Sequence, residues 1–335
     1  MVPMTNLANL EAALSTTLKD ATPAAQAELR RLASYRAPAP SIEYPTNRLA
    51  AVLVLLHLNP RGELAVTLTT RSKHLRSHPG ETALPGGRWE EGDGEGGEWT
   101  ALREANEEIG LPLPPRPGHP QPTASDQIGT AAPLLYLTSL PAYSSRTLLV
   151  VLPVVYLLLA PAETASFSCL PSFLNPNPGE VDAIFHLPLR SFLLLPPSSS
   201  GEECSAEGGL SYTYTDYTWL LSRPYRLHAF STPPSANTDS DSAPHSAVTG
   251  LTADIVLDVA LLAQYGTLLD SGLPPNAVGF ERRAQGQMEW SEIVDEALKV
   301  QKGAVNGSGA RHERGLGAKV GGEGETVVDE RTSAT

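Results

Sequence analysis

The spacing of apolar residues along the chain changes from helical to extended near residue 49. Leucines recur at helical spacing in the first part of the chain, which predicts a helical leader over about 5–35. After a Pro-rich joint, RAPAPSIEYP, the continuous apolar run LAAVLVLLHL (49–58) predicts a buried strand. LAVTLTTR (64–71) predicts a second strand. Because the turn NPRGE joins the two, we expect a hairpin.

Later segments predict further strands and a long helix. Strands are expected at about 128–138 and 147–159, and YTYTDYTWLL alternates between its two faces as a strand does. EVDAIFHLPLRSFLLL (180–195) mixes strand and helix signals, whereas LTADIVLDVALLAQYG (251–266) predicts a helix that closes the core. Strands interspersed with helices in this way indicate an α/β fold.

Three segments rich in Pro, Ser and Gly interrupt this pattern. PLPPRPGHPQPTASDQ cannot form regular structure, and PPSSSGEECSAEGG (196–209) and STPPSANTDSDSAPHS (231–246) are typical of surface insertions. We therefore expect a helical leader at 1–40, one α/β domain at 41–300 and a disordered tail at 301–335.

Composition and charge narrow the classes of function. The 335 residues carry a net charge of −13, which argues against a nucleic-acid-binding protein because such a protein needs a basic face. The two cysteines give neither a disulfide framework nor zinc-ligand spacing. We identify no targeting signal at the N-terminus, and the strongest apolar run (148–160) is too short to span a bilayer. We therefore expect a soluble intracellular protein without a membrane partner.

The segment EWTALREANEEIGL (98–111) gathers three glutamates on one face of a predicted helix. At helical spacing, Glu104, Glu107 and Glu108 share an arc of about 100° beside an apolar stripe, and no lysine is available to pair with them. Gly110 ends the helix. A divalent cation would relieve the repulsion, and oxygen ligands of this kind favour Mg²⁺ or Mn²⁺. A solvated acidic face fits the same spacing, so both interpretations stay open at this point.

The sequence around this helix resembles the Nudix box. That motif has the pattern Gly-x5-Glu-x7-Arg-Glu-apolar-x-Glu-Glu-x-Gly-apolar, and residues 103–111 reproduce its second half. Seven residues separate Glu95 from Arg103, as the pattern asks, but seven instead of five separate Gly87 from Glu95. The resemblance implies the Nudix fold, an α/β/α sandwich with a mixed β-sheet.

The resemblance also implies a reaction and a set of metal ligands. Nudix enzymes hydrolyse a nucleoside diphosphate linked to another group with the help of Mg²⁺ or Mn²⁺. Glu104 and Glu108 would be the first-choice ligands and Glu107 the third. A backbone carbonyl near Gly86 or Gly87 would join them, since glycine lets the chain approach the ion closely.

Two further residues would assist the implied chemistry. Arg103 would orient the glutamates through charge-assisted hydrogen bonds, although a surface ion pair of little value is the alternative interpretation. The general base would be a glutamate of the box or Glu180, which follows the loop NPNPG and precedes an apolar stretch. A solvent-facing loop acid is the alternative for Glu180.

A basic island in this acidic chain lies just upstream of the box. No Asp or Glu occurs from 64 to 80, whereas several cations do. The stretch resembles the signature LLTxR-(Ser/Ala)-x3-Arg-x3-Gly-x3-Phe-Pro-Gly-Gly of coenzyme A-cleaving Nudix enzymes, with Leu84 in place of Phe. The positions that keep its spacing are Arg71, Arg76, Gly80, Gly86 and Gly87.

This second resemblance implies cleavage of coenzyme A or an acyl-coenzyme A to 3′,5′-ADP and (acyl-)4′-phosphopantetheine, with Arg71 and Arg76 holding phosphates of the adenosine half. It also implies a peroxisomal or mitochondrial location. Two alternatives stay open: a Nudix hydrolase that acts on ADP-ribose, NADH or another nucleoside diphosphate derivative, and a non-catalytic Nudix-fold binding module. The expected partner is therefore a small molecule, and the sequence leaves both a monomer and a homodimer open.

Overall fold

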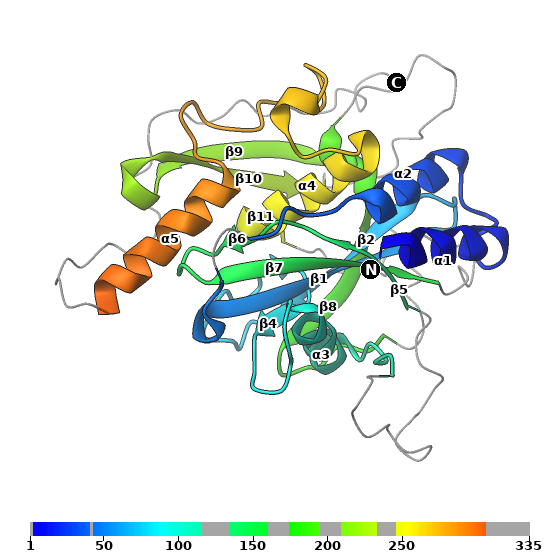
Figure 1. Ribbon diagram of the computed structural model, residues 1–335, viewed down its shortest axis with the longest axis horizontal. Coiled ribbons are helices and arrows are strands. Elements are labelled where there is room, and N and C mark those ends of the chain that lie inside the picture. Colours follow the sequence, from blue (N-terminus) through cyan, green and yellow to red (C-terminus); the bar gives the residue numbers. More distant parts are fainter. Residues whose placement is uncertain are drawn as a thin grey trace.

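A mixed β-sheet with helices on both faces forms the centre of the molecule. The computed structural model describes residues 3–40, 43–115, 134–159, 174–194, 209–232 and 246–305. The helices are α1 (Pro3–Ser15), α2 (Pro23–Ser34), α3 (Glu98–Ile109), α4 (Gly250–Tyr265) and α5 (Trp290–Val305). Figure 1 shows α3 on one side of the sheet and α1, α2 and α4 on the other, so the expected α/β/α sandwich is confirmed.

The strands belong to two sheets. The main sheet contains β1 (Leu49–Leu58), β2 (Leu64–Arg71), β3 (Thr82–Ala83), β4 (Gly86–Arg88), β5 (Leu134–Ser139), β6 (Tyr143–Ser144), β7 (Val150–Leu158) and β8 (Val181–Pro188). The smaller sheet contains β9 (Ser211–Thr218), β10 (Pro224–Ser231) and β11 (Val248–Thr249). In the main sheet β1 and β7 run parallel, whereas β2 and β5 are antiparallel to their neighbours β1 and β7.

The predicted hairpin over 49–71 is confirmed with the predicted strand bounds. Its two strands pair only near the turn, where Leu56, His57 and Leu58 face β2. Farther from the turn the strands separate, and the segment 82–88 fills the gap because β3 pairs with β2 and β4 pairs with β1. This wedge holds the glycines of β4 against β1, directly beside α3.

The leader folds onto the sheet and shares its core. It forms two helices instead of one, because Thr22 caps α2 by accepting a hydrogen bond from the Ala25 N–H, with Pro23 at the first helical position. Leu29 and Leu32 are fully buried in the core that also contains α4. At the other end α5 runs past residue 300, and the expected tail from 306 onward lies outside the described residues.

The other predicted elements fare as follows. The strand at 147–159 and the helix at 251–266 are confirmed as β7 and α4. The mixed signals at 180–195 resolve into β8 and a short 3-10 helix. The strand expected from 128 is described only from Leu134, as β5. Both cysteines, most of the proline-rich segment after α3 and most of the two Ser-rich insertions lie outside the described residues.

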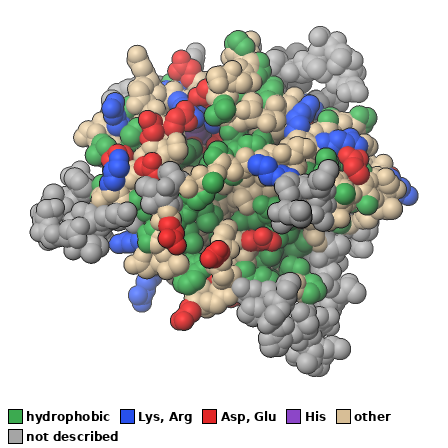
Figure 2. Space-filling view, in the orientation of Figure 1, with side chains coloured by type: hydrophobic (Ala, Val, Ile, Leu, Met, Phe, Trp, Pro, Cys, Tyr) green, Lys and Arg blue, Asp and Glu red, His purple; other side chains and the backbone are tan. Residues whose placement is uncertain are grey.

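Helix α4 belongs to the layer that it forms with α1 and α2 on one side of the sheet (Figure 1). The segment Gly250–Gly272 is long and apolar enough to cross a membrane by length and composition alone, but 61% of its apolar 18-residue window is buried inside the protein. The helix contacts α2 and β10, which explains why most of its residues are buried. Figure 2 shows acidic and basic side chains interspersed among apolar ones on the described part of one surface.

Candidate active site

The geometry of α3 follows from its apolar stripe and its terminal glycines. Ala101, Ala105 and Ile109 are fully buried against the odd-numbered face of β1, as the helical spacing predicted. The helix ends at Gly110, whose left-handed conformation (φ 68°) lets its N–H bond back to carbonyls of the last turn. The stripe fixes the rotation of the helix, so its acidic edge faces β4.

Two of the predicted ligands lie against the glycine turn of β4. The Gly86 N–H donates to Glu108 Oε2 at 3.1 Å. A Cβ placed on Gly87 would lie 2.3 Å from Glu104 Oε1, so only glycine lets this carboxylate approach the backbone. Gly86 is needed for a different reason, because its Cβ would lie 2.4 Å from the carbonyl oxygen of Ala51. The two glycines of the signature therefore let both carboxylates pack directly against the backbone of β4.

Burial raises the pKa of both carboxyl groups, and neighbouring carboxylates raise it further. Burial raises the pKa of Glu108 to about 7, the Gly86 N–H and the Arg71 guanidinium lower it, and the charges of Glu104 and Glu180 raise it. Burial likewise raises the pKa of Glu104, and Arg103 lowers it. Two acids are therefore held together in a site where a cation would be favourable.

Arg103 lies at the centre of a hydrogen-bonded cluster that includes an aspartate that the sequence analysis missed. Its Nε and Nη2 donate to Asp93 Oδ1 and Oδ2, each at 3.1 Å, in a bidentate pair. Its Nη1 lies 3.1 Å from Glu104 Oε1. Asp93 is buried and also accepts from Thr100 Oγ1 at 2.9 Å. Arg103 thus lies between Asp93, which holds its guanidinium, and Glu104; its orienting role stays a prediction.

The position of Asp93 explains the irregular spacing of the box. Five residues separate Gly87 from Asp93, which is the spacing that the pattern asks of its first glutamate. The two additional residues therefore follow Asp93, in the loop before α3. Glu95, to which the sequence analysis assigned that position, is exposed. Counting forward from the glycine instead of backward from Arg103 would have found Asp93.

Glu107 does not lie with the other two glutamates. Its side chain is 51% exposed, and Oε2 lies 3.2 Å from Arg103 Nη1. The structure therefore places this residue on the solvent side of Arg103. Among the described residues, no three His, Cys, Asp or Glu side chains converge in a metal-binding arrangement. The donor set nevertheless suits a hard cation, because Glu104 and Glu108 offer only oxygen atoms.

Arg71 at the end of β2 and Glu180 in the turn before β8 approach the same site. The strand register shifts between Thr70 and Arg71, and Arg71 Nη1 lies 3.8 Å from Glu108 Oε1. Arg71 Nε is buried and has no hydrogen-bond partner among the described residues. Glu180 is exposed, and its charge raises the pKa of both Glu104 and Glu108.

The remaining signature residues lie on the exposed loop between β2 and β3. Gly80 adopts a left-handed conformation (φ 71°), and its N–H donates to the Arg71 carbonyl at 3.0 Å. Its contribution is therefore the turn that returns the chain to β3. Arg76 is exposed on the same loop, and no described residue holds its side chain. The structure brings Arg71 to the carboxylates but not Arg76.

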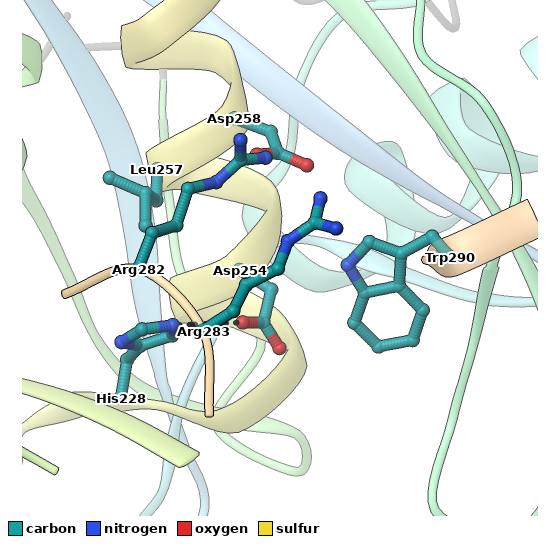
Figure 3. A pocket seen from close by; sticks show the side chains of 7 residues that line it. All are labelled: His228, Asp254, Leu257, Asp258, Arg282, Arg283 and Trp290. Carbon is teal, nitrogen blue, oxygen red and sulfur yellow. Dashed lines mark hydrogen bonds and ion pairs between the residues drawn. The ribbon is translucent and has the colours of Figure 1, made fainter. Parts of the chain in front are cut away.

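A second polar cluster, which the sequence analysis did not single out, lies beside the helix that was predicted to close the core. A small pocket with a cavity volume of about 20 Å³ lies between α4, β10 and the segment before α5 (Figure 3). Arg282 pairs with Asp258, and Asp254 accepts a hydrogen bond from Tyr225 at 2.5 Å. Burial lowers the pKa of His228 to about 3 and raises that of Asp254 to about 8. These groups satisfy one another and tie α4 to the neighbouring segments.

Comparison with known proteins identifies the domain. Residues 47–130 match the NUDIX domain family. The chain carries a Nudix domain. The matched region contains both glycines of β4, the whole of α3 and Arg71. The Nudix domain is thus the part of the chain that holds the clustered carboxylates, and the predicted family resemblance is confirmed.

Three curated relatives are similar to the Nudix domain and its surroundings. A mitochondrial Nudix hydrolase 15 of Arabidopsis thaliana is 41% identical over 43% of this chain and 41% of that protein. A peroxisomal coenzyme A diphosphatase of Caenorhabditis elegans is 37% identical over 43% of this chain and 50% of its own length. One of Saccharomyces cerevisiae is 35% identical over 45% and 44%, respectively. The chain therefore spans half or less of the length of these relatives.

Solved structures that resemble the chain also come from Nudix proteins. A Nudix hydrolase of M. smegmatis has a TM-score of 0.29 at 22% identity, over 42% of this chain and 70% of that chain. One from Alicyclobacillus acidocaldarius has a TM-score of 0.30 at 20% identity, over 46% and 82%. The fold assignment rests on the layers, the strand order and the domain match.

Proposed function

We propose that this chain hydrolyses the pyrophosphate bond of coenzyme A or an acyl-coenzyme A, with Mg²⁺ or Mn²⁺ as cofactor, to give 3′,5′-ADP and (acyl-)4′-phosphopantetheine. The observation that carries the proposal is the pairing of Glu104 and Glu108 on the glycine turn beside Arg71, whose Nε is buried without a partner among the described residues. Carboxylates and a guanidinium side by side suit a metal-bound polyphosphate, because the acids hold cations and the arginine binds phosphate.

Each residue of the site has a proposed role. Glu104 and Glu108 would hold the cation, with Glu107 as a third ligand once its side chain leaves Arg103. When bound, a divalent ion neutralises phosphate oxygens and acidifies the attacking water. Arg103 keeps Glu104 in place and is fixed by its bidentate contact with Asp93. A further carboxylate, that of Glu180, accepts the proton of the attacking water as general base.

The basic island gives the preference for coenzyme A its physical reason. Coenzyme A carries a 3′-phosphate in addition to its pyrophosphate, so it offers one more anionic group than ADP-ribose does. Arg71 binds a phosphate through the edge of its guanidinium that Glu108 leaves free, and Arg76 binds another from the exposed loop. Gly80 shapes the turn between them. The names of two of the relatives, which are coenzyme A diphosphatases, support the same substrate.

The experiment is a product analysis on a panel of substrates. Purified protein is incubated with coenzyme A, ADP-ribose or NADH, with Mg²⁺, with Mn²⁺ or with EDTA, and products are identified by mass. Glu108→Gln is the inactive variant, and Glu95→Gln, an exposed acid of the same box, is the matched control. We expect 3′,5′-ADP and 4′-phosphopantetheine from wild type and Glu95→Gln only when a divalent ion is present.

Each other outcome removes a defined part of the proposal. Cleavage of ADP-ribose or NADH with coenzyme A left intact would keep the hydrolase and remove the coenzyme A assignment of Arg71 and Arg76. Binding without cleavage of any substrate would replace the hydrolase with a binding module. Activity of Glu108→Gln equal to wild type would remove the assignment of the site itself.

We propose a small-molecule substrate as the only partner that the site requires. Nucleic acid is disfavoured because the chain has a net charge of −13 and because charges of both signs are interspersed on the surface in Figure 2. The names of the relatives point to mitochondria or peroxisomes, which we propose as the location to test by microscopy of the tagged chain.

A further inference from the structure

The loop of residues 174–180 is hydrogen-bonded both to the end of α3 and to the residue that follows β2. The last carbonyls of a helix have no partner within the helix, and here the loop supplies two. The Asn175 N–H donates to the carbonyl of Ile109, and the Asn177 N–H donates to that of Glu108, each at 2.9 Å. At the other end of the loop, the Glu180 carbonyl accepts a hydrogen bond from the Ser72 N–H. Ser72 follows Arg71, the proposed phosphate-binding arginine of β2. The loop is therefore anchored to both proposed binding elements.

Asn177 organises the turn that ends at Glu180. Its backbone carbonyl accepts from the N–H groups of Glu180 at 2.9 Å and Val181 at 2.8 Å. Its side-chain Oδ1 accepts from the Gly179 N–H at 3.1 Å, which closes an Asx turn over the same residues. The Glu180 carbonyl in turn accepts from the Ser72 N–H at 2.8 Å. The backbone of Glu180 is thus held on both sides.

We propose that Asn177 is a positioning residue that fixes Glu180 at the metal-facing side of the site, because one residue bonds both the carbonyl of Glu108 and the turn that carries Glu180. The inference rests on the proposed function, in which Glu180 is the general base. A side chain on an exposed loop would otherwise sample many rotamers and positions. Because Asn177 anchors the backbone of Glu180 to Glu108, a proposed ligand, the base keeps a fixed position relative to the metal site.

The test compares Asn177→Ala with three variants. Alanine removes the Oδ1 acceptor, whereas Asn177→Asp keeps it. Asn175→Ala is the matched control, because Asn175 belongs to the same loop and no hydrogen bond of its side chain involves a described residue. Glu180→Gln removes the base itself. The measurements are kcat and KM on coenzyme A, and amide hydrogen exchange at Gly179 and Glu180 in the absence of substrate.

We expect Asn177→Ala to lower kcat about three- to tenfold, the value of one hydrogen bond, with KM unchanged within about twofold. Asn177→Asp and Asn175→Ala should stay within about twofold of wild type. In the Glu180→Gln background Asn177→Ala should have no further effect. Exchange at Gly179 and Glu180 should be faster in Asn177→Ala alone.

Three results would overturn the inference. One is faster exchange in Asn177→Ala with kcat unchanged. Another is an equal loss of kcat from Asn177→Ala in the wild-type and Glu180→Gln backgrounds. The third is a chain that hydrolyses nothing on the panel. Cleavage of ADP-ribose or NADH instead of coenzyme A would remove only the proposed substrate, and the same four variants would then be compared on the substrate that is cleaved.

Discussion

Replacing Gly87 with alanine should disturb the proposed metal site while leaving the fold intact. The new Cβ would lie 2.3 Å from Glu104 Oε1 and from its Cδ, whereas ordinary contacts of a Cβ lie at 3.4–4 Å. The atoms that it meets are the far end of a flexible side chain, so the carboxylate can move away by about 1 Å without displacing the backbone. The backbone of Gly87 is not in the left-handed region, so alanine adds no backbone strain.

The expected consequence is a loss of activity with little loss of stability. A misplacement of about 1 Å in a catalytic group costs about 100-fold in rate, which is about 2.7 kcal/mol of transition-state stabilisation. The melting temperature should change by no more than a few degrees, because nothing in the buried core is disturbed. The assay is kcat on the cleaved substrate at saturating Mg²⁺, measured beside the melting temperature.

The neighbouring glycine provides the contrast. A Cβ on Gly86 would meet the Ala51 carbonyl oxygen at 2.4 Å and Val52 Cα at 2.7 Å, and these backbone atoms belong to β1. Gly86→Ala should therefore lower the melting temperature strongly, whereas Gly87→Ala should not. The reasoning would be refuted if Gly87→Ala kept more than about half of wild-type kcat, or if both variants lost stability equally.

Three further changes have defined outcomes. Asp93→Asn should lower kcat by about tenfold and stability by about 1–3 kcal/mol, because Arg103 loses its buried anionic partner; Glu95→Gln, measured alongside by the same kinetics and denaturation, should do neither. Arg71→Lys should raise the KM for coenzyme A by about tenfold with a smaller change in kcat, because lysine lacks the planar fork. Asp254, whose pKa burial raises to about 8, holds a proton in the folded state that the unfolded chain releases near 4. Its contribution to the free energy of unfolding is therefore fully present below pH 4 and lost as pH rises to 8, so Asp254→Asn should flatten the decline in denaturation midpoint between pH 5 and 9.

The sequence alone determined the elements whose signals are local. The apolar runs of β1 and β2 and the turn between them gave correct bounds, because a continuous buried run and its turn residues are neighbours along the chain. The rotation of α3 also followed from sequence, since its apolar stripe specifies which side chains enter the core. Glu104 and Glu108, one turn apart, were therefore correctly placed on a common edge beside the core.

Tertiary structure decided what depends on contacts between distant segments. Asp93 was missed because the two additional residues that follow it shift the spacing counted back from Arg103, and its bidentate contact with Arg103 shows which acid is held in the cluster. Glu107 turns toward Arg103, a choice that helical spacing leaves open. The cluster around Asp254 joins β10, α4 and the segment before α5, which are separate elements of the chain. Hydrophobic periodicity predicts which side chains of one element are buried. It does not predict their hydrogen-bond partners, because those partners lie on other elements of the fold.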